Sequence, residues 1–252
     1  MKISIITVCF NSAACISEAL RSIDMQEWQD IEHVVVDGGS DDATLAVLAT
    51  HTRPYRSVVS ERDSGIYDAM NKGVRRATGD VVGFLNADDM LADPAAIARI
   101  ARAFVEDPLL EACYGDLEYI SADEPSRTVR YWRSGKFESP MLRQGWMPPH
   151  PTFYVRRSLL ARVGEFDTEL RIAADYDLML RCLIQPELRI TYLPEALVRM
   201  RLGGASNATL RAMLRKSRED LLVMRRHGIG GVGSLLAKNL RKLPQFFMRP
   251  ES

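Results

Sequence analysis

The chain of 252 residues has a formal net charge of zero, with 46% hydrophobic and 26% charged residues. This composition is typical of a globular protein with one large domain or a domain with an appendage. It gives no indication of a nucleic-acid partner, and no apolar run approaches the roughly 18 residues of a membrane span. The four cysteines form no CxxC pair, which argues against a zinc site or a disulfide framework. With no signal-peptide pattern at the N-terminus, we expect a cytoplasmic protein.

The zero net charge conceals an asymmetry between the body and the C-terminal tail. From Arg201 onward, eleven Lys or Arg residues stand against three acidic residues, which gives +8 there and −8 in the rest. Residues 235–248 interleave basic and apolar side chains. Two interpretations of this tail remain open: peripheral contact with the inner face of an anionic membrane, or a contact within a homodimer.

The first half alternates strand and helix patterns. Short apolar runs at residues 3–8, 33–36, 57–59 and from Val81 predict strands, and apolar residues at helical spacing follow each run. This alternation predicts an α/β fold with a mainly parallel sheet flanked by helices. Every predicted strand in this half ends in a polar loop, and ligands of open α/β sheets bind at that edge.

The pattern is less regular after about residue 112. We expect strands at 113–120, 128–133, 153–155, 190–193 and 197–200, and helices at 158–163, 176–183 and 209–226. The predicted organisation is a domain at 1–206, made of a regular half (1–111) and a less regular half (112–206). A basic helical extension at 207–252 follows.

Adjacent carboxylates end the strand that begins at Val81. Asp88 and Asp89 would repel each other unless a cation lies between them, and Mg²⁺ or Mn²⁺ prefers oxygen ligands. The alternative is a solvated turn before the next helix.

Two further segments could bind a nucleotide. The loop after the first strand has no GxGxxG or Walker A pattern, but Asp37 could accept hydrogen bonds from a base or ribose beside Gly38. A capped turn is the alternative. In the segment 63–73, Asn71 is a poor helix former, which indicates a binding role, whereas Asp68 and Lys72 could form a plain surface pair.

Together these motifs resemble the family 2 inverting glycosyltransferases of the GT-A, Rossmann-like fold. The resemblance covers residues 1–206 and is greatest to members that build bacterial surface polysaccharides of the colanic acid or exopolysaccharide type. It implies that 1–111 is the nucleotide-sugar-binding half and 112–206 the acceptor and catalytic half. The matching motifs are Thr7-x-x-Phe10-Asn11, Asp37-Gly-Gly-Ser40, Asp63-x-Gly65, Asn86-Ala87-Asp88-Asp89, His150-Pro151-Thr152-Phe153 and Ala174-Asp175-Tyr176-Asp177.

The resemblance implies a UDP-sugar or GDP-sugar donor, a divalent metal and a saccharide or polyprenyl-linked saccharide acceptor. Asp89 would be the more direct metal ligand and Asp88 the second, although Asn86 replaces the more usual first aspartate. Asp37 would contact the nucleobase, and Asp63 the base or ribose. The residues expected to bind the nucleotide sugar are Thr7, Asn11, Asp37, Gly38, Asp63, Gly65, Asp68, Asn71, Lys72, Asn86, Ala87, Asp88, His150 and Arg201.

The resemblance also implies that Asp175 is the general base, which takes a proton from the acceptor hydroxyl during in-line displacement. Ala174 replaces the glutamate that often precedes this aspartate, and a helix cap is the alternative role for Asp175. Asp177 is the alternative base, although it would point elsewhere. His150 would act from a flexible loop, and Arg201, favoured over Arg199, would reach the diphosphate.

Two other functions remain open. A sugar nucleotidyltransferase would carry a loop rich in Gly and Arg or Lys after the first strand, and this loop has neither. A non-catalytic, sugar-nucleotide-binding scaffold subunit is suggested by Asn86 and Ala174.

Overall fold

In the computed structural model, which describes residues 1–121, 124, 127–202 and 210–241, nine strands form one sheet in the order β3-β2-β1-β4-β8-β6-β9-β5, with β7 paired to β6. The strands are β1 (Ile3–Cys9), β2 (Ile31–Asp37), β3 (Arg56–Ser60), β4 (Val81–Phe84), β5 (Met90–Leu91), β6 (Ala112–Ile120), β7 (Thr128–Trp132), β8 (Tyr154–Arg156) and β9 (Ile190–Arg201). The helices are α1 (Ile16–Asp24), α2 (Thr44–Thr50), α3 (Ile66–Arg76), α4 (Ala96–Glu106), η1 (Ser139–Gln144), η2 (His150–Thr152), α5 (Arg157–Val163), α6 (Ala174–Leu183), α7 (Leu210–Arg226) and α8 (Val232–Leu240).

The expected α/β architecture is confirmed, and the sheet is parallel in its N-terminal half and mixed beyond it. Strands β1 to β4 pair in parallel. Strand β8 then enters antiparallel between β4 and β6, so that the predicted halves 1–111 and 112–206 share one continuous sheet.

Strand β9 corrects the prediction of two short strands. It is one long strand, whose parallel pairing with β6 shifts register around Asp116. Pro194 lies in β9 and cannot donate a hydrogen bond to the ladder, which is why the sequence pattern is interrupted there. Strand β5 was not predicted at all, since two residues are too few to show a pattern.

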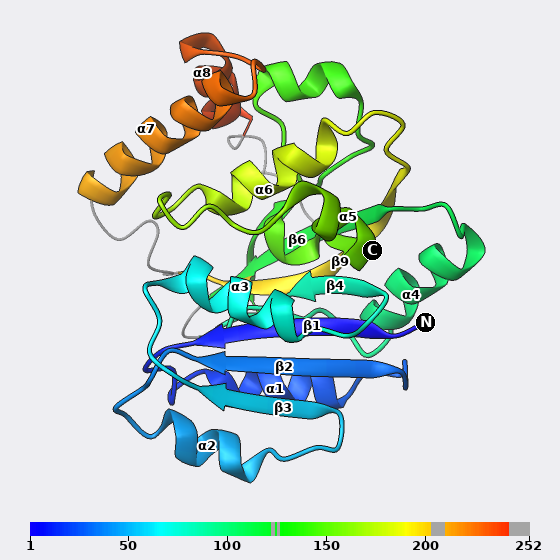
Figure 1. Cartoon of the computed structure of the whole chain (residues 1–252), viewed down its shortest axis with the longest axis vertical. Coiled ribbons are helices and arrows are strands. Elements are labelled where there is room, and N and C mark those ends of the chain that lie inside the picture. The colour runs from blue at the N-terminus through cyan, green and yellow to red at the C-terminus, as the bar shows by residue number, and fades with distance from the viewer. Residues whose placement is uncertain (122–123, 125–126, 203–209, 242–252) are drawn as a thin grey trace.

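Helices cover both faces of the sheet, as Figure 1 shows. Along β1, Ile3 and Ile5 face the core shared with α1 and α4, whereas Ile6 and Val8 face the core shared with α3, α5 and α6. This alternation follows from the two-residue period of a strand. Apolar side chains therefore cover both faces of the sheet, and polar residues lie at the carboxyl ends of the strands.

The C-terminal extension packs on the body beside α6, at the end of the molecule opposite α2 (Figure 1). Val223, Met224 and Ile229 belong to the same buried core as Tyr176 and Leu180 of α6. Helix α8 begins at Val232, earlier than predicted, and the part of the predicted 235–248 segment beyond residue 241 lies outside the described residues. No helix among the described residues is long and apolar enough to cross a membrane.

The close approach of β4 and β8 gives a stability prediction. A Cβ added to Gly83 would overlap the ring of Tyr154, which is fully buried. We expect Gly83→Ala to lower the free energy of unfolding by about 1–3 kcal/mol through overpacking, measured by urea denaturation. Gly233→Ala in α8 is the matched control, because its Cβ would meet no atom within 4 Å. Equal stabilities of the two variants would contradict this packing.

Candidate active site

The carboxyl end of β4 holds a buried carboxylate with an unpartnered oxygen. Asp89 is 1% exposed, and its Oδ2 accepts a hydrogen bond of 2.9 Å from Asn86 Nδ2. Its buried Oδ1 has no hydrogen-bond partner in the part of the chain that the structure describes. Burial, and then the neighbouring charge of Asp88, raise the pKa of Asp89 well above its ordinary value.

This donor set fits a divalent cation. An orphaned carboxylate oxygen beside a second carboxylate is a hard, anionic ligand pair of the kind that Mg²⁺ or Mn²⁺ selects. The described residues contain no group of three or more His, Cys, Asp or Glu that could hold a metal by themselves. Asp88 and Asp89 could thus bind a cation only together with ligands from water or a substrate. Ala87, just before them, packs into the apolar core around Ile16 and Leu20 of α1.

The Asp37 turn differs from the role implied by the resemblance. Asp37 is 0% exposed, and its carboxylate accepts hydrogen bonds from the backbone N–H groups of Gly39 (3.2 Å) and Ser40 (3.1 Å) and from the hydroxyl groups of Ser40 and Ser60. These bonds lower its pKa although burial opposes them. The carboxylate is fully engaged within the protein, which corresponds to the capped-turn alternative rather than to a base-reading role.

Asp63 is the more accessible carboxylate at this edge. It is partly exposed, and its Oδ1 accepts a 2.9 Å hydrogen bond from the N–H of Gly65. A Cβ on Gly38 would overlap the Asp63 carboxylate, so the glycine is required for this approach. Asn11 borders the same edge at φ 49°, and its Oδ1 accepts a 3.0 Å hydrogen bond from the N–H of Asp41. Left-handed backbone of this kind favours Asn among non-glycine residues.

Thr7 and Asn71, both predicted to contact the nucleotide sugar, are buried cross-links instead. Thr7 is 0% exposed, and its hydroxyl lies 3.0 Å from Nε2 of His33. The amide of Asn71 donates to the carbonyl of Phe166 (3.0 Å) and accepts from its N–H (2.8 Å). Both side chains are buried and bonded within the protein in this structure.

Asp68 and Lys72 hold the loop that precedes α3. Asp68 accepts a 2.9 Å hydrogen bond from the N–H of Ser64, and Lys72 donates a 2.7 Å bond to the carbonyl of Arg62. The two side chains also form the i,i+4 pair, at 3.6 Å. Gly65 begins α3 at φ 131°, a conformation that side-chain-bearing residues rarely adopt.

Asp175 lies in the first turn of α6, close to Tyr67 of α3. The hydroxyl of Tyr67, on α3, donates to the carbonyl of Ile172 (2.7 Å) and lies 3.4 Å from Asp175 Oδ1. Burial, and then the charge of Asp175, raise the pKa of Tyr67, so that the phenol stays protonated as a donor. Sequence reasoning missed Tyr67, because its place inside the 63–73 motif gives no sign of a partner 105 residues later.

His150 is placed by packing rather than by a flexible loop, which corrects the prediction. It begins η2 and stacks on Phe84 of β4, with ring centroids 5.3 Å apart. Burial lowers its pKa although the charge of Asp175 opposes this, and its buried Nε2 has no hydrogen-bond partner among the described residues. The ring therefore lies between the strand that leads to Asp89 and the helix that carries Asp175.

Asp177, the alternative base, is engaged elsewhere. It is 2% exposed, bonded to Arg181 at 2.8 Å and to His227 at 2.8 Å. Its carboxylate points into the contact between α6 and α7, which agrees with the expectation that it would face away from Asp175.

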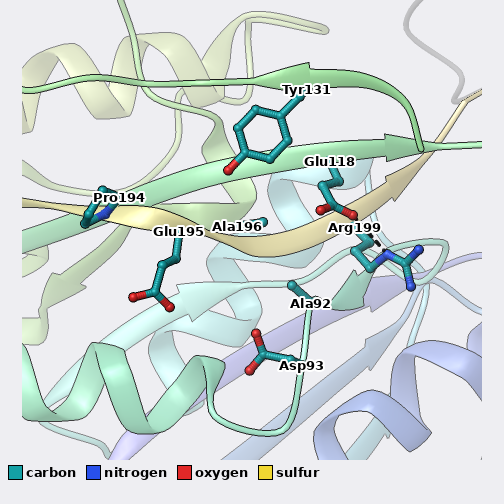
Figure 2. A pocket seen from close by; sticks show the side chains of 8 residues that line it. All are labelled: Ala92, Asp93, Glu118, Tyr131, Pro194, Glu195, Ala196 and Arg199. Carbon is teal, nitrogen blue, oxygen red and sulfur yellow. Dashed lines mark ion pairs between the residues drawn. The ribbon is translucent and has the colours of Figure 1, made fainter. Parts of the chain in front are cut away.

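Arg201 lies at the end of β9, and Arg199 two residues earlier. The pairing of Met90 with Arg199 brings the end of β9 beside the Asp89 segment, and Arg201 forms an ion pair with Glu18 of α1. Arg199 forms an ion pair of 3.3 Å with Glu118 and lines a cavity of about 360 Å³ (Figure 2). The other residues lining that cavity are Ala92, Asp93, Glu118, Tyr131, Pro194, Glu195 and Ala196. None of them belongs to the predicted site.

This chain is similar in sequence to known proteins. The sequence model of glycosyl transferase family 2 matches residues 4–163. A PGL/p-HBAD biosynthesis glycosyltransferase of Mycobacterium bovis (strain BCG / Pasteur 1173P2) is 33% identical over 208 residues, which are 81% of this chain and 78% of the relative.

Two solved structures share the fold. S. aureus TarS 1–349 in complex with UDP-GlcNAc superposes with a TM-score of 0.68 at 21% identity, over 91% of this chain and 66% of that chain. The mannosyltransferase PcManGT from Pyrobaculum calidifontis in complex with GDP-Man and Mn²⁺ gives 0.67 at 20% identity, over 98% and 73%. This chain thus spans slightly less than two thirds of the TarS fragment. The GT-A fold expected from the sequence is confirmed.

The buried His33 beneath the site gives a pH prediction. Burial, and then the charge of Arg56, lower the pKa of His33 well below its ordinary value of 6.5. The unfolded chain therefore binds a proton below pH 6.5 that the folded protein does not bind, and stability falls as the pH falls. As the pH falls, we expect the free energy of unfolding to decline more steeply in the wild type than in His33→Gln. The difference between the two slopes should be up to about 1.4 kcal/mol per pH unit.

The measurement is urea denaturation of both proteins between pH 6.5 and 5.5. In the wild type, Nε of Arg56 donates a 2.8 Å hydrogen bond to His33 Nδ1. The amide of the His33→Gln variant can still bond to Thr7 and Arg56, but this amide does not titrate. Parallel pH profiles would show that His33 is protonated equally in the folded and unfolded states.

Proposed function

Since the chain belongs to glycosyl transferase family 2, we propose that it is an inverting glycosyltransferase. It would move a sugar from a UDP- or GDP-linked donor to a saccharide acceptor. The observation that carries the proposal is the buried Asp89 carboxylate with its unpartnered oxygen, linked through the Phe84–His150 stack to Asp175.

Asp88 and Asp89 would hold Mg²⁺ or Mn²⁺ together with the donor diphosphate. When bound, the cation would neutralise the charge that develops on the departing diphosphate. The support is the donor set itself and the Mn²⁺ in the complex of the mannosyltransferase from Pyrobaculum calidifontis. Asp63 and Asn11 border the same sheet edge and would contact the nucleoside, with Gly38 and Gly65 leaving room for the backbone to approach it.

Asp175 would take the proton of the attacking hydroxyl. In one in-line step the acceptor oxygen bonds to the anomeric carbon, the bond from that carbon to the diphosphate oxygen breaks, and the proton passes to the Asp175 carboxylate. Tyr67 stays protonated and orients this carboxylate. His150, neutral and with Nε2 unpartnered among the described residues, is available to donate to or accept from a substrate hydroxyl.

The acceptor would be a saccharide, free or carried on a polyprenyl lipid, in the assembly of a bacterial polysaccharide or glycolipid. The catalytic domain would be residues 1–206 and the extension residues 207–252. On the extension, Leu236 and Leu240 of α8 are exposed apolar side chains, and the exposed Arg241 follows them, which favours peripheral contact with the cytoplasmic face of a membrane. A homodimer contact is the alternative use of the same surface.

A non-catalytic scaffold subunit is the second candidate, favoured by Asn86 and Ala174 where the resembling family more often has acidic residues. It would bind the donor without turnover. A nucleotidyltransferase has less support, because the loop after β1 lacks the basic and glycine residues that it would need.

The metal site is tested by calorimetric titration with UDP and with GDP, each with Mn²⁺ and with EDTA. We expect one nucleotide to bind with Mn²⁺ and to bind at least about tenfold more weakly in EDTA or to Asp89→Asn, because the diphosphate then loses its bridging cation. Asp89→Asn keeps the side-chain shape and removes a buried charge, so its thermal stability should not fall. Binding that is indifferent to EDTA would exclude this role for Asp88 and Asp89.

The base is tested by Asp175→Asn. We expect kcat for sugar transfer or donor hydrolysis to fall about 10²- to 10⁴-fold, with nucleotide affinity unchanged, because the amide cannot accept the proton. Glu106→Gln, at an exposed position at the end of α4, controls for loss of one negative charge. Undiminished turnover would assign the proton to another group, and wild-type donor binding without any turnover would favour the scaffold.

A further inference from the structure

The segment that leads into α6 is bound by a carboxylate from the C-terminal extension. Oε2 of Glu219, on α7, accepts hydrogen bonds from three consecutive backbone N–H groups, those of Arg171 (3.1 Å), Ile172 (2.8 Å) and Ala173 (3.0 Å). Ala173 is the N-cap of α6 and has no side chain that could satisfy these donors. Of these three donors, only the N–H of Ala173 belongs to the start of the helix, and those of Arg171 and Ile172 lie in the segment before it. A negative charge beside a helix N-terminus is favourable.

The same segment is held from its other side by α3. The carbonyl of Ile172 accepts the hydroxyl of Tyr67, and its N–H donates to Glu219. One residue, Ile172, is therefore bonded through its carbonyl to α3 and through its N–H to α7 of the extension. Asp175 follows three residues later, in the first turn of α6.

Helix α7 is itself fixed on the body, so Glu219 has a defined position. Asp220, its neighbour, is 2% exposed and accepts a 2.8 Å hydrogen bond from the buried Lys238 of α8. The Lys238 ammonium lies 3.3 Å from the ring centroid of Tyr176, the residue after Asp175. Arg226, at the other end of α7, bonds to Asp167 at 2.6 Å.

We infer that Glu219 is a positioning residue for the catalytic base: through the backbone of residues 171–173 it sets the direction in which α6 presents Asp175. The inference rests on the proposed function, in which Asp175 takes the proton. The basic extension then serves the chemistry itself, since it completes the N-terminus of the helix that carries the base.

The test is a double-mutant cycle on the full chain with Glu219→Ala and Asp175→Asn. The rate is nucleoside diphosphate release from UDP-GlcNAc or GDP-Man with Mn²⁺ and water as acceptor. We expect Glu219→Ala to lower kcat about 10- to 100-fold, the loss expected from a displacement of about 1 Å, with KM for the donor unchanged. In the Asp175→Asn background it should cause no further loss, because both changes act on one group.

Two further variants separate position from general stability. Glu219→Gln retains an acceptor oxygen without the charge and should recover part of kcat. Glu169→Gln removes one charge at an exposed position nearby and should leave kcat unchanged. Hydrogen exchange of the amides at 171–173 should accelerate in Glu219→Ala, which tests the contact whether or not turnover is measurable.

The outcomes separate the inference from the proposed function. Full activity of Asp175→Asn would overturn the assignment of the base, and with it this role for Glu219. An inactive Asp175→Asn alongside a fully active Glu219→Ala would overturn the inference alone. Equal losses from Glu219→Ala in both backgrounds, or unchanged amide exchange, would overturn it as well.

Discussion

A carboxylate that is buried away from water needs hydrogen-bond donors or a cation to keep its charge. The buried acidic residues of this protein differ in whether the described residues supply such partners. Asp37 has its donors in its own turn and in β3, and Asp177 has Arg181 and His227. Both oxygens of each of these two carboxylates have partners within the protein. Asp89 is buried equally deeply, but one of its oxygens has no hydrogen-bond partner among the described residues. In the proposed function a bound cation would compensate for this burial, and the donor that shares the cation would take a fixed place at the end of β4.

The second carboxylate of the site is held by side chains from other elements. Phe84 belongs to the strand that leads to Asp89, and the ring of His150 stacks on Phe84. The charge of Asp175 acts on the pKa of His150. Tyr67 joins α3 to the start of α6. The separation of Asp89 from Asp175 is consequently set by packed rings and one phenol. Such a fixed separation would suit the proposed in-line displacement, in which the attacking and departing groups must lie on opposite sides of one carbon.

The sequence predicted what local patterns determine. The strands β1 to β4 and the helices of this half each have their own periodicity, so all of these elements were predicted. Strands β2 and β3 nevertheless extend beyond the predicted residues 33–36 and 57–59. The antiparallel entry of β8 and the continuous β9 depend on pairing between distant segments, and Pro194 masked the latter. At the site, motif order identified Asp89 and Asp175 as candidates. It could not show that Thr7 and Asn71 are occupied by internal bonds, because their partners are fixed only when the chain folds.

The start of α6 shows how the chain compensates locally for a missing charge. The family that the sequence resembles often has a glutamate just before the base, and here Ala174 offers no charge and is buried. A carboxylate is nevertheless present at this helix start, because Glu219 brings it from α7 to the N–H groups of the preceding peptides. The predicted boundary at residue 206 thus separates the sequence motifs of the proposed reaction from α7, whose Glu219 bonds to the segment before α6. In the proposed mechanism the base Asp175 and Glu219, which we infer to position it, lie on opposite sides of that boundary, so the extension and the catalytic half would act as one functional unit.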